Sequence, residues 1–389
     1  MLLESLFLLL PVAAVSGWVA GRRNQLTQQE NPANTISPIY LKGLNFLLNE
    51  QPDKAIDVFI QLLEVDSDTI ETHLALGSLF RRRGEVDRAI RIHQNLIARP
   101  SLSKEQRSQA LFELGQDYLR AGLLDRAEAL FSELIASAPH TEVALNYLID
   151  IYQQERDWEK AIETARRIEV KTGNKQHTRV AHYYCELAEQ AMHNGDKSRA
   201  HKLARKALGT NKNSVRGSLL EAKLEIQNGN DKAAIKALRR VEQQDSSYFG
   251  EAVPLLVECY QRQSKMAELV DYLEQIMSQQ QTVSAVLVLS EQIQKQQGEN
   301  EAVHFITEAL KTHPSIKLLD KLIDLNITQT TETARDKLQV LKDVTSKLLA
   351  NKPVYQCHLC GFSSKQLYWQ CPGCRTWESL KPIQGTEGE

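Results

Sequence analysis

Four cysteines near the C-terminus have the spacing of a metal site. They form two C-x2-C pairs, Cys357 with Cys360 and Cys371 with Cys374, separated by ten residues. A C-x2-C pair puts two thiolates on one tight turn, and two such turns facing each other make a tetrahedral S4 site. The cluster therefore predicts one bound metal ion with these four ligands, and the thiolates accept either iron or zinc.

The segment around the cysteines is too short to have a core of its own, so the metal must supply much of its folding energy. His358, between the first two ligands, is expected to be a solvent-facing turn residue rather than a fifth ligand. Apolar cover comes from Phe362, Tyr368, Trp369 and Trp377. Because these aromatic side chains exceed what a free knuckle could bury, we expect residues 353–383 to pack on the rest of the chain.

Composition restricts the class of protein. The chain has 389 residues, 25% of them charged, and a net charge of −2. It therefore lacks the clustered basic excess that nucleic-acid binding requires. Cys185 and Cys259 stand alone within helical patterns and are expected to be buried thiols. The cysteine usage fits a reducing, cytoplasmic setting rather than a disulfide-stapled secreted domain.

An uncharged run, SLFLLLPVAAVSGWVAG, extends from Ser5 to Gly21 and is followed directly by two arginines. It is about the minimum length for a membrane-spanning helix. By the positive-inside rule, the body that follows lies in the cytoplasm. We predict a single-pass anchor over residues 1–21 and a polar linker over residues 22–37.

A cleaved signal peptide is the alternative for this run, because Ala14-Val15-Ser16 resembles a cleavage site. Signal peptides carry their positive charge before the apolar stretch, however. Here only Glu4 precedes the run and both arginines follow it, so the anchor is favoured.

A small residue recurs about every 34 residues through the middle of the chain. The positions are Ala55, Ala89, Ala127, Ala161, Ala200 and Ala234. Twelve residues before each is a second small or apolar residue: Gly43, Gly77, Gly115, Ile149, Ala188 and Ala222. An aromatic residue follows three positions later in the first four units, as Phe46, Phe80, Tyr118 and Tyr152. Glycine recurs between the two helices of a unit, at Gly84, Gly122, Gly195 and Gly229.

This pattern resembles the tetratricopeptide repeat, in which small residues let the two helices approach and the aromatic fills the gap to the next unit. We expect six clear repeats and two or three decayed ones beyond residue 245. Residues 38–345 would then form one right-handed superhelix of helix pairs. The fold class is accordingly all-α: a solenoid with an N-terminal transmembrane helix and a small C-terminal metal knuckle.

Such a solenoid offers a concave groove for a peptide or protein segment. The repeat aromatics, such as Phe80 and Tyr118, are interpreted as core rather than ligand contacts. The arginine-rich segment from Arg81 to Gln94 admits two interpretations. It is either a solvated helix face or a site for an acidic partner segment.

The knuckle sequences CHLCGF and CPGCR resemble those of rubredoxin. This resemblance favours iron, although zinc also fits. Two departures weaken an electron-transfer role, because both reduce the shell that shields and tunes an iron centre. The segment between the pairs is shorter than in free rubredoxins, and Arg375 stands where rubredoxins have glycine.

The order of features resembles the lipopolysaccharide assembly protein B family of Gram-negative bacteria. The resemblance rests mainly on residues 77–94 and 355–383. It implies a non-catalytic inner-membrane adaptor that regulates lipopolysaccharide biosynthesis. In this family the protein works with a membrane AAA+ protease and promotes degradation of the lipid A deacetylase, its client. An inner-membrane lipopolysaccharide sensor opposes it. The family's metal ligands correspond to the four cysteines, and a homodimer is compatible with this reading.

Two other functions compete with the adaptor. A general scaffold for lipopolysaccharide or envelope assembly enzymes would form stable complexes without changing the lifetime of a client. A rubredoxin-like electron carrier would bind iron that is reversibly reduced. The sequence contains no nucleotide-binding loop, His-Glu metalloprotease motif or nucleophile elbow, which favours a protein that is not an enzyme.

Overall fold

The structure is a computed structural model of the whole chain. It describes residues 38–49, 51–65, 70–136, 141–278, 282–329 and 332–386, together with Trp18 and Gly388. The predicted anchor and linker, residues 1–37, lie outside the described residues, Trp18 excepted. No helix in the described ranges is both long enough and apolar enough to cross a bilayer.

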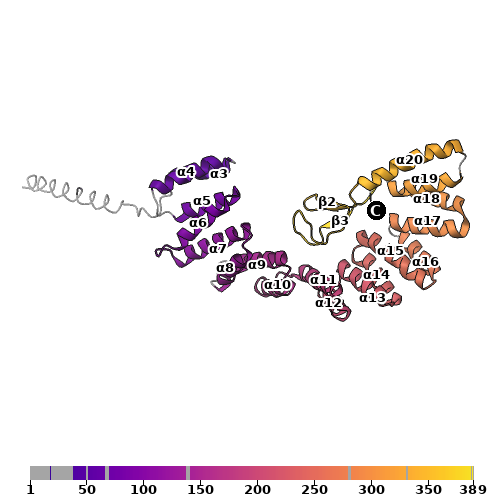
Figure 1. Cartoon of the computed structure of the whole chain (residues 1–389), viewed down its shortest axis with the longest axis horizontal. Helices are drawn as coiled ribbons and strands as arrows, with labels where there is room; N and C mark the ends of the chain where they lie inside the picture. Colours follow the sequence, from indigo (N-terminus) through magenta and orange to yellow (C-terminus); the bar gives the residue numbers. More distant parts are fainter. Residues whose placement is uncertain are drawn as a thin grey trace, which may run out of the picture. The chain divides into compact units, whose positions relative to one another are not determined.

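The described chain between residues 38 and 351 is helical, and its helices follow one another in nine pairs (Figure 1). The first six pairs cover the clear repeats, and the last three cover the decayed ones. The pairs are α3 (Pro38–Leu48) and α4 (Pro52–Val65), α5 (Ile70–Arg82) and α6 (Val86–Ile97), α7 (Lys104–Arg120) and α8 (Leu124–Ala136), α9 (Thr141–Glu155) and α10 (Trp158–Thr172), α11 (His177–His193) and α12 (Lys197–Thr210), α13 (Val215–Gln227) and α14 (Asp231–Gln244), α15 (Phe249–Arg262) and α16 (Met266–Met277), α17 (Val283–Gln297) and α18 (Glu299–Thr312), and α19 (Ile316–Gln329) and α20 (Glu332–Asn351). A short 3-10 helix, η1 (Ser246–Tyr248), precedes α15.

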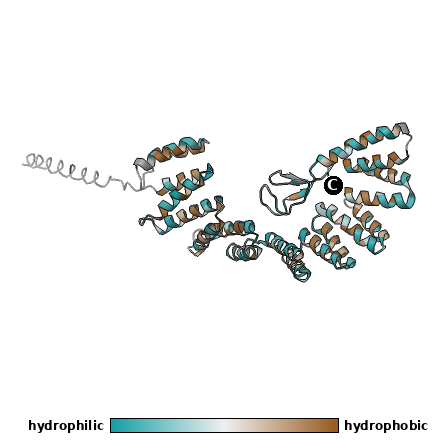
Figure 2. Ribbon diagram, viewed as in Figure 1, coloured by the Kyte–Doolittle hydropathy of each residue, from teal (hydrophilic) through white to brown (hydrophobic). Residues whose placement is uncertain are grey.

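The helices group into two compact units, residues 1–144 and residues 145–389. Hydrophobic and hydrophilic residues alternate along the helices of both units (Figure 2), as expected for helices that bury one face against their neighbours. We expected the repeats to end near residue 345, and α20 ends at Asn351.

The repeat alanines lie in the buried interior between the helices. All six are fully buried: Ala55, Ala89, Ala127, Ala161, Ala200 and Ala234. The glycines of the preceding helices in the first three units each face a large side chain sixteen positions later. A Cβ atom on Gly43 would meet the Phe59 ring at 2.6 Å, and one on Gly115 would meet the Phe131 ring at 2.9 Å. Glycine therefore sets the distance between the paired helices.

The repeat aromatics make a contact that the repeat pattern did not reveal. In four successive units the aromatic ring lies under a cation eight residues later. Arg88 lies 4.0 Å from the centre of the Phe80 ring, and Lys160 lies 5.1 Å from that of Tyr152. The other two pairs are Lys54 with Phe46 and Arg126 with Tyr118. Cation–π attraction thus joins the two helices in each of these four units, which supports a structural role for the rings.

Substituting Gly115 by alanine tests the close packing of α7 on α8. The new methyl group would displace the Phe131 ring, so we expect a loss of about 1–3 kcal/mol in unfolding free energy. Gly209 provides the control, because it lies in α12 and a Cβ atom there meets nothing within 4 Å. Gly209→Ala should stabilise by up to about 1 kcal/mol, since alanine favours helix. Urea denaturation measures the unfolding free energy of both variants. Equal changes in the two would mean that Gly115 is not required for the close packing of α7 on α8.

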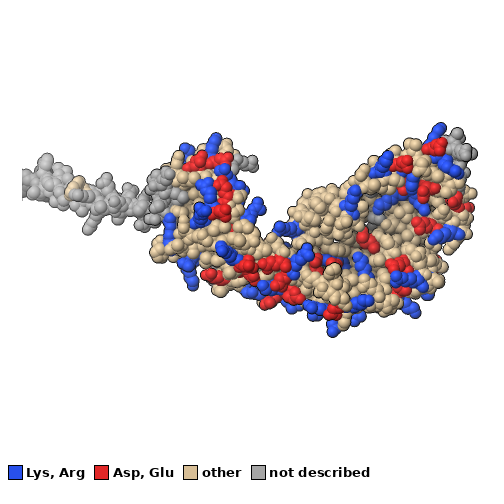
Figure 3. Space-filling model, in the orientation of Figure 1, with Lys and Arg blue, Asp and Glu red and all other residues tan. Residues whose placement is uncertain are grey.

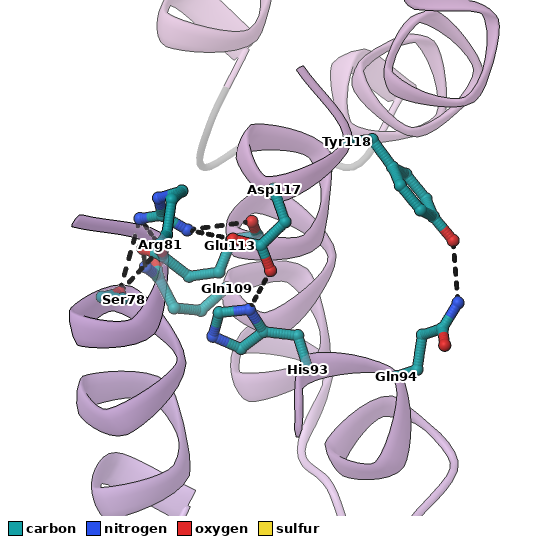
Figure 4. Close-up of polar contacts among 8 residues, drawn as sticks. All are labelled: Ser78, Arg81, His93, Gln94, Gln109, Glu113, Asp117 and Tyr118. Carbon is teal, nitrogen blue, oxygen red and sulfur yellow. Dashed lines mark hydrogen bonds and ion pairs between the residues drawn. The ribbon is translucent and has the colours of Figure 1, made fainter. Parts of the chain in front are cut away.

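The arginine-rich segment is used largely within the chain itself, which neither sequence interpretation anticipated. Arg81 pairs with Glu113 at 2.6 Å and with Asp117 at 2.7 Å, both on α7 (Figure 4). His93 is fully buried and approaches the other oxygen of Asp117 through Nδ1 at 2.5 Å. It occupies the position that Phe59 and Phe131 hold in neighbouring units.

This network joins the second helix pair to the third, because a carboxylate of α7 contacts both α5 and α6. A buried carboxylate is tolerated only when it is paired in this way. Charged groups of both signs are interspersed over the visible face of the molecule (Figure 3), in keeping with the net charge of −2.

The C-terminal knuckle is a three-stranded antiparallel sheet that follows α20. Its strands are β1 (Tyr355–Cys357), β2 (Ser363–Ser364) and β3 (Leu380–Pro382), in the order β2-β1-β3. Tyr355 pairs with Ser364 on one side and with Pro382 on the other. The buried hydrophobic cluster of the described knuckle is small: Tyr355, Cys357, Cys371 and Leu380.

Candidate metal centre and its socket on the solenoid

The structure brings the four predicted ligands together. The sulfur atoms of Cys357, Cys360, Cys371 and Cys374 all lie within 4.8 Å of one another. Two sulfur–sulfur distances are 3.7 Å, from Cys357 to Cys374, and 3.6 Å, from Cys360 to Cys371. A tetrahedron with metal–sulfur bonds of about 2.3 Å has edges of about 3.8 Å. The cysteines therefore form a possible tetrathiolate metal site.

The surroundings of two of the thiols, Cys357 and Cys374, favour negative charge on sulfur, whereas the neighbouring cysteines raise the pKa of Cys360. Burial opposes ionisation of Cys357, but hydrogen bonds from the Ser379 hydroxyl and from the backbone of Cys360 and Leu359 outweigh it and lower its pKa to about 6. Hydrogen bonds from the side chain and backbone of Thr376 likewise lower the pKa of Cys374. Several thiolates in so small a volume repel one another, so this chemistry fits a bound cation.

Backbone geometry at the second turn is tight. A Cβ atom on Gly373 would meet the Cys360 sulfur at 3.2 Å, which explains glycine there. Arg375, the residue that replaces the glycine of rubredoxins, adopts a left-handed φ of 57°. The turn thus keeps the glycine-type conformation despite the substitution. Its backbone N–H donates to the Cys371 carbonyl at 2.8 Å.

The knuckle inserts one tryptophan into a socket on the solenoid. Trp377 is 8% exposed and stacks on His182, with ring centres 4.7 Å apart and an interplanar angle of 19°. Its indole N–H donates to the side-chain oxygen of Gln153 at 2.9 Å. Trp158 and Tyr183 meet the indole edge to face at 6.3 and 5.9 Å. A buried tryptophan with a partner for its N–H is a strong anchor.

Charged groups line the same socket. Glu378 lies 3.0 Å from Nε2 of His182, within ion-pair distance although without hydrogen-bond geometry. Arg216 is nearly fully buried and lies 5.9 Å from the Trp377 ring centre. It pairs with Glu186 at 2.8 Å and with Glu189 at 2.9 Å. Both carboxylates belong to the solenoid and balance the charge of Arg216. The flat face of the guanidinium group can therefore lie against the indole of Trp377.

A second row of contacts holds β3 and Trp369. Trp369 stacks on Tyr248 of η1 at 5.5 Å, and the Tyr248 hydroxyl donates to the Leu380 carbonyl. Lys381 pairs with Asp245 at 2.9 Å. The Tyr355 hydroxyl donates to Glu251 of α15. The packing of the knuckle on the solenoid, expected from its surplus of aromatic residues, is therefore present.

Most of the contacting residues come from the first helices of successive pairs. Gln153 lies on α9, His182 on α11, Arg216 on α13 and Glu251 on α15. Sequence reasoning identified the knuckle's half of this interface but none of these partners. Tyr368, which was expected to provide apolar cover, is instead 41% exposed, so this prediction is wrong. His358 is exposed, as expected, and its Nδ1 lies 2.8 Å from the Ser379 carbonyl oxygen.

The two isolated cysteines behave as predicted. Cys185 and Cys259 are fully buried in α11 and α15. Burial raises the pKa of Cys185 to about 12 and that of Cys259 to about 11. Both are therefore protonated and inert at neutral pH.

The His182 contact predicts a pH dependence of stability. Burial lowers the pKa of His182, and Glu378 only partly offsets this. Below the ordinary histidine pKa of about 6.5, the unfolded chain takes up a proton that the folded protein resists. We expect His182 to reduce stability as pH falls from 7 to 5.5, by at most about 1.4 kcal/mol per pH unit.

Urea denaturation at several pH values measures this effect. His182→Phe keeps a ring against Trp377 but cannot titrate, so its stability should depend less on pH over that window. His193→Phe serves as the control, because His193 lies exposed at the end of the same helix. Parallel pH profiles for wild type and His182→Phe would contradict the prediction.

Full-length matches to known proteins identify the family of this chain. A protein of Escherichia coli (strain K12), "Lipopolysaccharide assembly protein B", is 43% identical over 389 residues and covers all of both chains. The chain belongs to the lipopolysaccharide assembly protein B family. The protein of that name from Haemophilus influenzae is 33% identical over 395 residues, covering 99% of this chain and all of its own.

Separate parts of the chain also match known domain families. Residues 355–382 match the family described as rubredoxin metal binding domain. Residues 72–107, 112–175 and 185–248 match tetratricopeptide repeat families. Among solved structures, the C-terminal part of a TPR repeat-containing protein from Cytophaga hutchinsonii is 13% identical, covers 64% of this chain and 99% of its own, and has a TM-score of 0.41.

Proposed function

We propose that this chain is a non-catalytic adaptor of the bacterial inner membrane that regulates lipopolysaccharide biosynthesis. The observation that carries the proposal is full-length identity of 43% to a protein named lipopolysaccharide assembly protein B. In this role it brings the lipid A deacetylase, its client, to a membrane AAA+ protease for degradation. An inner-membrane lipopolysaccharide sensor opposes that action.

The architecture supports an adaptor. A solenoid of helix pairs presents an extended surface to a protein segment. The knuckle is fixed on the first helices of the pairs from α9 to α15 and so shapes that surface. The two acid–base pairs formed by buried histidines, His93 with Asp117 and His182 with Glu378, support a non-catalytic role, because both histidines are 0% exposed.

The proposed location depends on the N-terminal sequence. The apolar run of residues 5–21 would anchor the chain, and the arginines that follow it would keep the body on the cytoplasmic side. In this proposal, the anchor would hold the solenoid beside a membrane-bound protease.

The proposed metal is iron, with zinc as the alternative. The match of residues 355–382 to the rubredoxin metal binding domain supports a four-thiolate metal site, and the resemblance of the knuckle sequences to rubredoxin favours iron. When bound, the ion joins the two cysteine turns and stabilises the fold of the knuckle. Its role here is structural, because residues just after the last cysteine hold the knuckle on the solenoid.

Measuring the half-life of the deacetylase tests the function. Cells lacking the chain should retain the deacetylase longer than cells that contain it. Trp377→Ala should behave like the deletion, and Tyr368→Ala, at the exposed side of the same knuckle, should behave like wild type. A half-life that does not depend on the chain would remove the degradation adaptor and favour a general assembly scaffold.

A further inference from the structure

The last helix of the solenoid carries an exposed apolar stripe. α20 is the outermost helix at its end of the stack, beyond α19 (Figure 1). Four of its large apolar side chains are open to solvent: Val340 is 63% exposed, Leu341 52%, Val344 50% and Leu348 45%. Val344 lies three or four positions from each of the other three, so all four share one face of the helix. Single exposed apolar residues are ordinary, but a continuous row marks an interaction surface.

The side of α20 that faces α19 is held in part by polar contacts. Thr345 is buried, and its hydroxyl donates to Asp320 of α19 at 2.6 Å. Lys342 pairs with the other oxygen of that carboxylate at 2.8 Å. Leu338 and Leu349, on the same side, are only half-buried. A surface helix normally turns its apolar face inward and its polar face to water, so the outward apolar stripe is not explained by packing within the chain.

The earlier helix pairs cover the corresponding surface. The second helix of each pair contacts the first helix of the next, as α12 does with α13, α14 with α15 and α18 with α19. α20 has no following pair, because the chain continues into the knuckle at β1. The terminal repeat of a solenoid normally ends in a polar outer face. α20 instead keeps an apolar surface that a further helix would cover.

The charged residues beside the stripe indicate which helix that is. Asp343 and Lys347 are both exposed and lie one turn apart on the same flank of the stripe. An anionic lipid surface would favour a flank that is only positive. A second α20 lying antiparallel along the stripe, with Val344 near the two-fold axis, brings Asp343 of each copy to Lys347 of the other. Both pairs form at once, because a two-fold axis repeats every contact.

We propose that two copies of this chain associate through α20. The two helices pack antiparallel along the stripe of Val340, Leu341, Val344 and Leu348, and the two reciprocal Asp343–Lys347 pairs fix their register. The same surface is used on both copies, so the interface closes on itself and gives a dimer rather than a filament.

Sedimentation of the full-length protein in detergent tests the proposal. The wild type should pass from monomer to dimer as its concentration rises through the micromolar range. Val344→Glu should raise the dimer dissociation constant at least about a hundredfold, because it buries two like charges at the centre of the interface. Val170→Glu is the matched control: Val170 is 87% exposed on α10, outside the stripe, so this variant should dimerise like the wild type.

Val344→Glu should keep the fold of the monomer, because the side chain is half exposed there, and circular dichroism checks this. Val340→Glu, at the most exposed position of the stripe, repeats the test should Val344→Glu fail to fold. A wild type that stays monomeric throughout the range would overturn the proposal and assign the stripe to a helix of another protein or to the membrane. A dimer that both glutamate variants leave intact would also overturn it, because association would then come from another surface.

Two charge variants test the antiparallel register. Lys347→Asp turns both ion pairs into repulsions and should weaken the dimer about tenfold. Asp343→Lys combined with Lys347→Asp exchanges the two charges, so the reciprocal pairs form again with opposite sense. This double variant should regain an affinity within about threefold of the wild type. A double variant that dimerises no better than Lys347→Asp would overturn the antiparallel pairing.

Discussion

Substitution of Cys371 by serine is expected to release the metal ion and unfold the knuckle while leaving most of the solenoid helical. Cys371 is 1% exposed, and its sulfur lies 3.6 Å from that of Cys360. Four buried residues cannot hold such a sheet without the metal. Structural zinc sites in small peptides contribute about 10–16 kcal/mol, which is far more than this core can replace.

Three measurements on the purified protein check this result. Metal analysis should show loss of the ion and should also identify it as iron or zinc. Tryptophan fluorescence should shift, because Trp377 leaves its buried site and Trp369 leaves its partly buried one. Far-ultraviolet circular dichroism should stay near the wild-type value, since repeats are stabilised by their neighbours. Cys259→Ala removes a buried thiol of the solenoid and should keep the metal. A Cys371→Ser protein with a full complement of metal would show that Cys371 is not a ligand.

Truncation of Trp377 to alanine should detach the knuckle while leaving its metal in place. The indole is lost from the stack on His182 and from its hydrogen bond with Gln153. Loss of a buried tryptophan costs about 3–5 kcal/mol. Because all four thiols remain, the metal content should be unchanged. This variant therefore separates docking from metal binding, which the cysteine substitution cannot do.

Urea denaturation measures the cost, and Tyr368→Ala is the matched control. Tyr368 is an aromatic residue of the same knuckle but is 41% exposed, so its removal should change stability by about 0.5 kcal/mol or less. Similar losses in the two variants would mean that the socket contributes little to holding the knuckle.

The repeat pattern predicted most of the fold because each repeat is defined locally. Ala89 and Gly77 lie within one helix pair, and their small size dictates how closely that pair packs. The cysteine spacing predicted the metal site for the same reason, since each pair of sulfurs comes from a single turn. All the residues that define such a feature lie within a few dozen positions of one another in the sequence.

The partners of the knuckle could not be found in this way. Gln153, His182 and Arg216 lie on three different helices, and nothing in their own repeats distinguishes them from ordinary polar or charged residues. Only the stacking of successive pairs brings them to one socket. The role of His93 could not be predicted either. It stands where neighbouring repeats have phenylalanine, and its carboxylate partner, Asp117, belongs to the next unit.

The hydrogen bond between Trp377 and Gln153 joins residues 224 positions apart in the chain. The helix pairs contact their sequence neighbours and can form as soon as those neighbours exist. The knuckle must instead close a very long loop. At translation rates of about 5–20 residues per second, its tryptophan follows Gln153 by roughly 10–45 s. During that interval the socket is open, and its aromatic residues are exposed. We therefore expect closure by the metal-loaded knuckle to be the last event of folding, one that a truncated or metal-free chain cannot complete.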